Sequence, residues 1–99
     1  MKLKVQSIHF DADQKLLDFI QVKVDKLTHL YDDIIGGEVF LKLEKKNVPE
    51  NKIVEIKLQI PGKILFAKEQ SHTFEAATDI AIASLVTQVK KQKEKARNQ

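Results

Sequence analysis

The chain has 99 residues, of which 42% are hydrophobic and 31% charged, and this composition excludes a disordered segment and indicates one globular domain with a modest core. The sequence contains no cysteine, which excludes disulfides and thiolate chemistry and fits a reducing compartment, so we expect a cytoplasmic protein. No apolar run approaches the ~18 residues of a membrane span, and Met1 is followed by a polar strand pattern instead of a signal peptide.

The amino-terminal third predicts a strand followed by a long helix. Residues 2–8 alternate between apolar and polar side chains, which is the period of a strand with one buried face. Asp11 or Asp13 offers an N-cap for a helix over about residues 14–34, whose apolar positions recur at helical spacing. The glycine pair 36–37 predicts the end of this helix, because glycine tolerates the left-handed backbone of a C-terminal cap.

The middle of the chain predicts three further strands joined by short connections. Residues 38–45 and 53–60 both alternate, and the stretch 46–51, which contains a proline, is typical of a surface turn. The dipeptide Pro61-Gly62 is a tight-turn signal, so residues 64–69 should return as the fourth strand.

The carboxyl-terminal part predicts a second long helix that ends in concentrated positive charge. Thr73 is the predicted N-cap of a helix over about residues 74–93. The last ten residues, KKQKEKARNQ, hold five of the 17 basic and one of the 14 acidic side chains. Such a local cation suits a phosphate backbone or an anionic membrane, although a frayed, solvated terminus would look the same. We expect one domain over residues 1–93 and a basic, frayed tail over 94–99.

Together these elements predict an α+β fold in the order β-α-β-β-β-α. Each helix has a one-sided apolar stripe and each strand hides one face, which predicts a two-layer sandwich with both helices on one face of a four-stranded sheet. The short connections favour a mostly antiparallel sheet. The other face of the sheet should meet solvent and carries Lys2, Lys4, Lys42 and Lys57.

The sequence contains no pattern typical of a catalytic or metal-binding site. The three histidines, His9, His29 and His72, lack the spacing of metal ligands, and the serines lie outside any nucleophile-elbow setting. With three glycines in the chain, a phosphate-cradling loop is not expected either. We therefore predict that the protein is not an enzyme and uses no cofactor, metal or small-molecule substrate.

One lysine lies where the predicted apolar face of the first helix should carry an apolar side chain. Lys23 falls inside the apolar arc of this helix, and Lys26 lies at the edge of the same arc. The lysine stems could cover apolar surface while the ammonium groups reach water. Alternatively, both side chains could emerge between the two helices and bind phosphates. The pattern alone leaves both interpretations open.

Five segments occur in an order and spacing that resemble one known family: LKVQSIHF, LLDFIQVKVDKLTHLYDDI, VFLKLEK, the PG turn with Leu65 and Ala67, and AATDIAIASLVTQVKKQK. The chain resembles the short ribosome hibernation-promoting factors and ribosome-associated inhibitor A, also called the sigma-54 modulation family. The resemblance implies a β-α-β-β-β-α fold similar in topology to double-stranded RNA-binding domains. It implies a bacterial stress and stationary-phase factor that docks on the small ribosomal subunit, in the mRNA and tRNA channel, and inhibits translation.

The resemblance also implies which residues contact ribosomal RNA. By position they are a basic pair in the first helix, a lysine that closes the second strand, and a glutamine and lysines at the basic end of the last helix. These residues are Lys23, Lys26, Lys45, Gln88, Lys90, Lys91, Lys93 and Lys95. Asp79 matches an aspartate of the family's last helix, to which the resemblance assigns no role.

Two positions depart from the family pattern. Family members usually carry a lysine where this chain has Ser84 and an arginine where it has Thr87. These positions should share one edge of the helix with Lys91 and Lys95. Half of the basic stripe is therefore neutral here, and we expect the RNA contacts to be displaced toward the carboxyl terminus.

Two other binding functions are compatible with parts of the sequence. A generic double-stranded RNA-binding module would share the topology, although the Gly-Pro-X-His loop and Lys-Lys-X-X-Lys helix start of those domains are absent. A membrane-surface protein could use the basic tail, but residues 90–99 contain no large apolar side chain to insert. We expect the small ribosomal subunit as the partner, no membrane contact, and a monomer when the protein is free.

Overall fold

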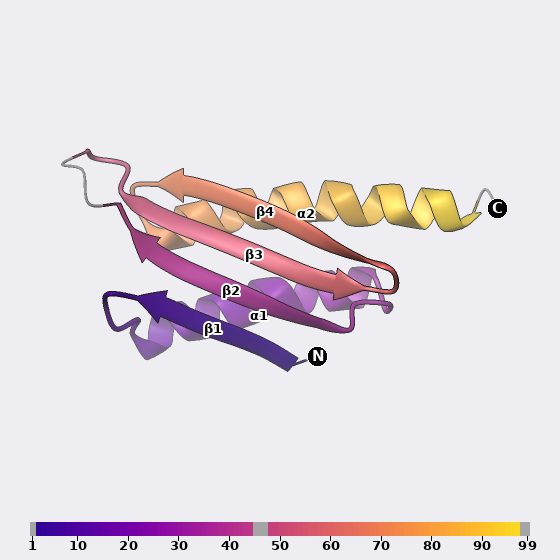
Figure 1. The fold of residues 1–99 in the computed structure, drawn as a ribbon, viewed down its shortest axis with the longest axis horizontal. Coiled ribbons are helices and arrows are strands. Elements are labelled where there is room, and N and C mark those ends of the chain that lie inside the picture. The colour runs from indigo at the N-terminus through magenta and orange to yellow at the C-terminus, as the bar shows by residue number, and fades with distance from the viewer. Residues whose placement is uncertain (1, 45–47, 98–99) are drawn as a thin grey trace.

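The computed structural model describes residues 2–44 and 48–97, which form four strands and two helices in the order β-α-β-β-β-α (Figure 1). The four strands form one sheet in sequential order. β1 and β2 are parallel, because a helix crosses over between them, whereas the other two pairs are antiparallel. The predicted fold class is therefore confirmed. The elements are β1 (Lys2–Ile8), α1 (Gln14–Leu30), β2 (Gly36–Leu43), β3 (Lys52–Ile60), β4 (Lys63–Ser71) and α2 (Phe74–Arg97).

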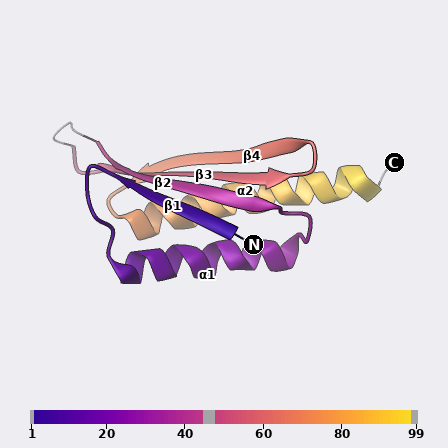
Figure 2. The same cartoon turned by 60° about the horizontal axis from the view of Figure 1, so that its bottom comes forward.

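Both helices cover the same face of the sheet, and the core lies between the two layers (Figure 1, Figure 2). Alternate residues of the strands point into this layer, as do the apolar stripes of the helices. Ile20, Leu41, Ile56 and Leu85 are fully buried there. Burial of one such side chain contributes about 1.5–3 kcal/mol to stability. The apolar stripes that the periodicity predicts therefore hold the two layers together.

Local sequence signals set the starts of both helices and the turn between β3 and β4. The Asp13 carboxylate is the N-cap of α1 and accepts a hydrogen bond from the Leu16 amide at 2.8 Å. The Thr73 hydroxyl accepts one from the Ala76 amide at 3.0 Å at the start of α2. Gly62 has φ of 81°, a left-handed conformation that favours glycine and allows a two-residue turn.

The first helix ends earlier than the sequence predicted. α1 stops at Leu30, and Tyr31 already has extended backbone, so the expected end near residue 34 was wrong. The glycine pair begins β2 instead of capping the helix. A Cβ on Gly37 would lie 3.0 Å from the Leu58 side chain. Close packing of β2 against side chains of its two neighbouring strands therefore explains this glycine, and left-handed backbone does not.

The second helix extends further than predicted. α2 continues to Arg97, so residues 94–97 of the expected frayed tail are helical, and 98–99 lie outside the described residues. Residues 74–97 contain neither glycine nor proline, and their Ala, Gln, Glu, Lys and Arg side chains favour helix. In Figure 1 the end of α2 projects beyond the end of the sheet. The basic residues thus stand on regular helix instead of an irregular tail.

The face of the sheet opposite the helices carries exposed lysines, as expected for Lys4 and Lys57. Lys42 is half-buried and forms an ion pair with Glu55 on the neighbouring strand. The side chain of Lys2 lies outside the part of the chain whose side chains are described. Among the described residues, no helix combines the length and apolar character needed to cross a membrane.

Candidate nucleic-acid interface

A groove runs between β4, at the edge of the sheet, and the carboxyl-terminal half of α2. Its volume is about 360 Å³. Three lysines, two glutamines and three apolar residues line it. Because none of the lining residues is acidic, the groove is electropositive. We call it the β4–α2 groove, and its lining residues are Lys63, Ile64, Leu65, Phe66, Gln88, Lys91, Gln92 and Lys95.

Gln88 holds α2 against the edge strand. Its side-chain Nε2 donates to the backbone carbonyl oxygen of Phe66 at 2.9 Å and to the Ser84 hydroxyl at 3.2 Å. An edge strand has backbone groups that no further strand can pair, and the amide satisfies one of them. Both amide hydrogens are used in this way, so Oε1 is the atom that could accept a hydrogen bond from RNA.

The four predicted lysines of α2 divide between two flanks of the helix. Lys91 and Lys95 are four residues apart, share one flank, and both line the β4–α2 groove. Lys90 and Lys93 are exposed and lie about 100–160° around the helix from these two residues, on the side that carries Asp79. The helix therefore presents positive charge on two sides, and only one side belongs to the groove.

Lys23 extends from α1 to α2. Its Nζ atom lies 3.1 Å from Oδ1 of Asp79 and 5.3 Å from the ring centroid of Phe19. The side chain of Lys23 is 29% exposed and that of Asp79 54%, so the ion pair is at the surface of the interhelical seam. Asp79, whose role was unassigned, thus joins the two helices. Lys26 is exposed one turn further along α1.

Two polar residues of the groove were missed by the sequence analysis. Lys63 directly follows the Pro61-Gly62 turn, and that turn signal already indicates the first residue of a returning strand. Its proximity to α2 depends on which strand lies at the sheet edge, which the turn does not reveal. Gln92 lies one turn from Gln88 and carries no distinguishing signal. The predicted site residue Lys45 lies outside the described residues.

The described residues offer binding by charge and hydrogen bonds. No group of three His, Asp or Glu side chains among them could hold a metal ion. The His72 and Glu50 side chains, whose nearest nitrogen and oxygen are 3.6 Å apart, are both more than 60% exposed and form an ordinary surface contact. The lysines of the groove can neutralise the phosphates of a nucleic acid, and the glutamines can hydrogen-bond to its sugars.

Comparison with known proteins identifies the family of this chain. The family described as sigma 54 modulation protein / S30EA ribosomal protein matches residues 3–97. A ribosome hibernation promoting factor of Pseudomonas putida is 32% identical over 95 residues, which are 96% of this chain and 89% of that protein.

Two solved structures share the fold. A ribosomal subunit interface protein from Coxiella burnetii superposes with a TM-score of 0.85 at 21% identity, covering 95% of this chain and 99% of that one. The N-terminal domain of Protein Y from Thermus thermophilus gives a TM-score of 0.74 at 27% identity, with 91% and 93% coverage. Because the family match spans almost the entire chain, the protein belongs to the sigma 54 modulation protein / S30EA ribosomal protein family.

Proposed function

We propose that this protein is a ribosome-associated hibernation factor that binds ribosomal RNA of the small subunit, in the mRNA and tRNA channel, and inhibits translation during stress or stationary phase. The observation that carries the proposal is the β4–α2 groove, where lysines from two distant segments meet without an acidic side chain. The names of the family and of the Pseudomonas putida relative support the ribosome as the partner.

In this proposal the protein acts by binding, as a cytoplasmic monomer, and catalyses no reaction. Lys63, Lys91 and Lys95 neutralise phosphates along the groove, and each contact releases condensed counterions. A second set of cations, two on α1 and two on the other side of α2 from the groove, also contacts RNA. This set comprises Lys23, Lys26, Lys90 and Lys93, and Lys45, which follows β2 in the sequence, is proposed to add a contact.

Sedimentation through sucrose gradients tests the proposal. The protein should migrate with small subunits or whole ribosomes, and this association should weaken steeply between about 50 and 200 mM salt, because backbone contacts depend on counterion release. Equal affinity for a free RNA duplex would favour a generic double-stranded RNA-binding module instead. Association that does not change with salt would exclude phosphate neutralisation as the main source of affinity.

The contribution of Lys23 to ribosome binding can be measured separately from its contribution to folding stability. We expect Lys23→Met to change the free energy of unfolding by less than about 1 kcal/mol, because methionine keeps the apolar stem and a surface ion pair contributes little. The same variant should bind small subunits more weakly, since one cation beside the seam is lost. Urea denaturation and co-sedimentation measure the two effects.

Lys15→Met is the matched control for this experiment, because Lys15 is an exposed lysine in the first turn of α1, about two turns away from Lys23. It should leave both stability and ribosome binding close to those of the parent. If the Lys23 and Lys15 variants bind ribosomes equally well, Lys23 acts only by pairing with Asp79.

A further inference from the structure

Two apolar side chains of β4 are exposed on the face of the sheet that no helix covers. Ile64 is 61% exposed and Phe66 is 43% exposed. Between and beside them, Leu65 and Ala67 are buried under α2. Because successive side chains of a strand point to opposite faces, Ile64 and Phe66 stand together on the open face.

Positive charge lies on two sides of the Phe66 ring. Lys57 on β3 is directly opposite Phe66 in the strand register, and Lys68 is two residues further along β4 on the same face. Both lysines are exposed. Phe40 also belongs to this face but is half-buried, and the Lys57 ammonium lies 5.5 Å from its ring centroid. Phe66 is therefore the more accessible of the two aromatic rings.

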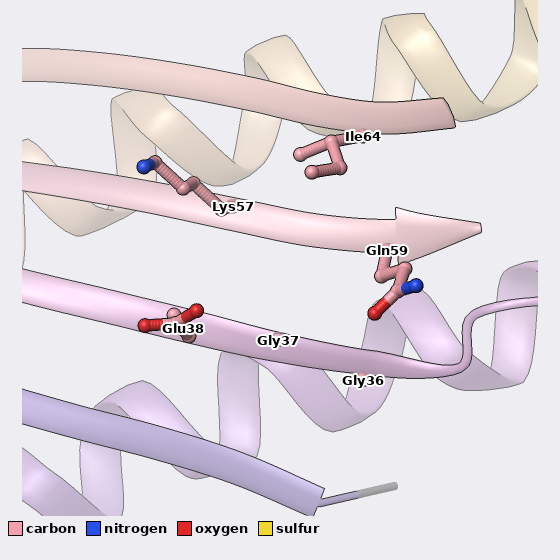
Figure 3. Close-up of a pocket in the computed structure, with 6 residues that line it drawn as sticks. All are labelled: Gly36, Gly37, Glu38, Lys57, Gln59 and Ile64. Carbon is pink, nitrogen blue, oxygen red and sulfur yellow. The ribbon is translucent and has the colours of Figure 1, made fainter. Parts of the chain in front are cut away.

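A shallow depression adjoins the side chains of Ile64 and Lys57 (Figure 3). Its volume is about 110 Å³, and it spans β2, β3 and β4 where Gly36 contributes no side chain. Gln59 and Glu38 offer an amide and a carboxylate at its border. Ile64 lines both this depression and the β4–α2 groove. The two features therefore meet at the edge strand, and an extended ligand could pass from one to the other.

We propose that Ile64 and Phe66 form a stacking platform for an unpaired base of single-stranded RNA. The phosphates further along the strand run through the β4–α2 groove, and this part of the inference rests on the proposed function. Aromatic rings stack on any base and are the usual platforms of single-strand binding surfaces. Lys57 and Lys68 contact the flanking phosphates, and the amide of Gln59 is placed to hydrogen-bond the edge of the base.

The size of the patch argues for a base and against a protein partner. A stable protein interface buries about 800 Å² on each partner, far more than two side chains can supply. A single base needs one ring face and nearby cations, and the open side of β4 offers both. A base in a duplex is already stacked and paired, so the platform selects single strands.

Fluorescence anisotropy with the full chain tests the inference. The probes are a labelled oligouridylate of about eight nucleotides and an RNA duplex of the same length. Phe66→Leu keeps an apolar side chain but removes the ring, and it should weaken binding of the single strand about tenfold and binding of the duplex far less. Val22→Ala, at a 55% exposed apolar position on α1, should leave both affinities unchanged.

A second variant reports on stacking directly. The chain contains no tryptophan, so Phe66→Trp places a single tryptophan on the platform. The tryptophan emission should be quenched by the oligouridylate, and the affinity of the Phe66→Trp protein should equal or exceed that of the parent. A Val22→Trp protein should show no quenching.

Three results would overturn the platform. In the first, Phe66→Leu binds the single strand as tightly as the parent does. In the second, Phe66→Leu loses the same factor of affinity for the single strand and for the duplex. In the third, Phe66→Leu loses affinity for ribosomes but not for the oligonucleotide. The last result would assign the patch to a protein partner. If the parent fails to sediment with ribosomes, the proposed function fails, and the oligonucleotide comparison still judges the platform.

Discussion

Replacing Lys91 and Lys95 together with glutamine should lower the affinity for small ribosomal subunits by about 25- to 60-fold at 0.1 M salt. Both side chains line the β4–α2 groove, and each neutralised phosphate contributes about 0.7–0.9 to the slope of log K against log salt. The slope should therefore become shallower by about 1.4–1.8. Glutamine favours helix nearly as well as lysine, so α2 should keep its length and stability.

The control for this variant removes the same charge from the opposite end of the molecule. Lys15→Gln with Lys52→Gln changes the start of α1 and the start of β3, far from the basic end of α2 (Figure 1). It should shift the affinity little, because net charge affects long-range attraction and not the direct contacts. If both double variants lose affinity equally, the groove has no special part in binding and net charge alone explains it.

Restoring the family's cations at the two neutral positions should have the opposite effect. Ser84→Lys with Thr87→Arg adds two positive charges on the flank of Lys91 and should tighten ribosome binding by about tenfold or more near 0.1 M salt. The gain should shrink as salt rises, because it comes from counterion release. A cell-free translation extract should then be inhibited at a lower concentration of protein.

The structure separates these two positions. Thr87 is exposed, as predicted, whereas Ser84 is half-buried and its hydroxyl accepts a hydrogen bond from Gln88. Ser84→Lys removes this acceptor at a cost of about 0.5–1.5 kcal/mol, so Thr87→Arg alone is the cleaner test of charge. Ser84→Gln with Thr87→Gln controls for side-chain length. An unchanged affinity for every charged variant would mean that RNA does not contact this flank of α2.

Strand alternation, helical periodicity and capping residues were sufficient to predict the element order and the buried faces. These signals are local: a carboxylate at Asp13 or a hydroxyl at Thr73 reaches an amide three residues away, whatever the rest of the chain does. The alternation of β3 likewise assigns Ile56 and Leu58 to the same face before any partner strand is known.

The site itself depended on contacts between distant segments. Lys63 joins Lys91 and Lys95 only because β4 lies at the sheet edge and α2 packs beside it. Gln88 donates a hydrogen bond to the carbonyl oxygen of Phe66, 22 residues away in the sequence, and Lys23 forms an ion pair with Asp79 on the other helix. The glycine pair was wrongly predicted to cap the helix for the same reason, because the local sequence pattern does not indicate that Gly37 packs closely against Leu58. Local periodicity specifies which face of an element is buried, whereas the neighbours of an exposed side chain follow from how the elements pack.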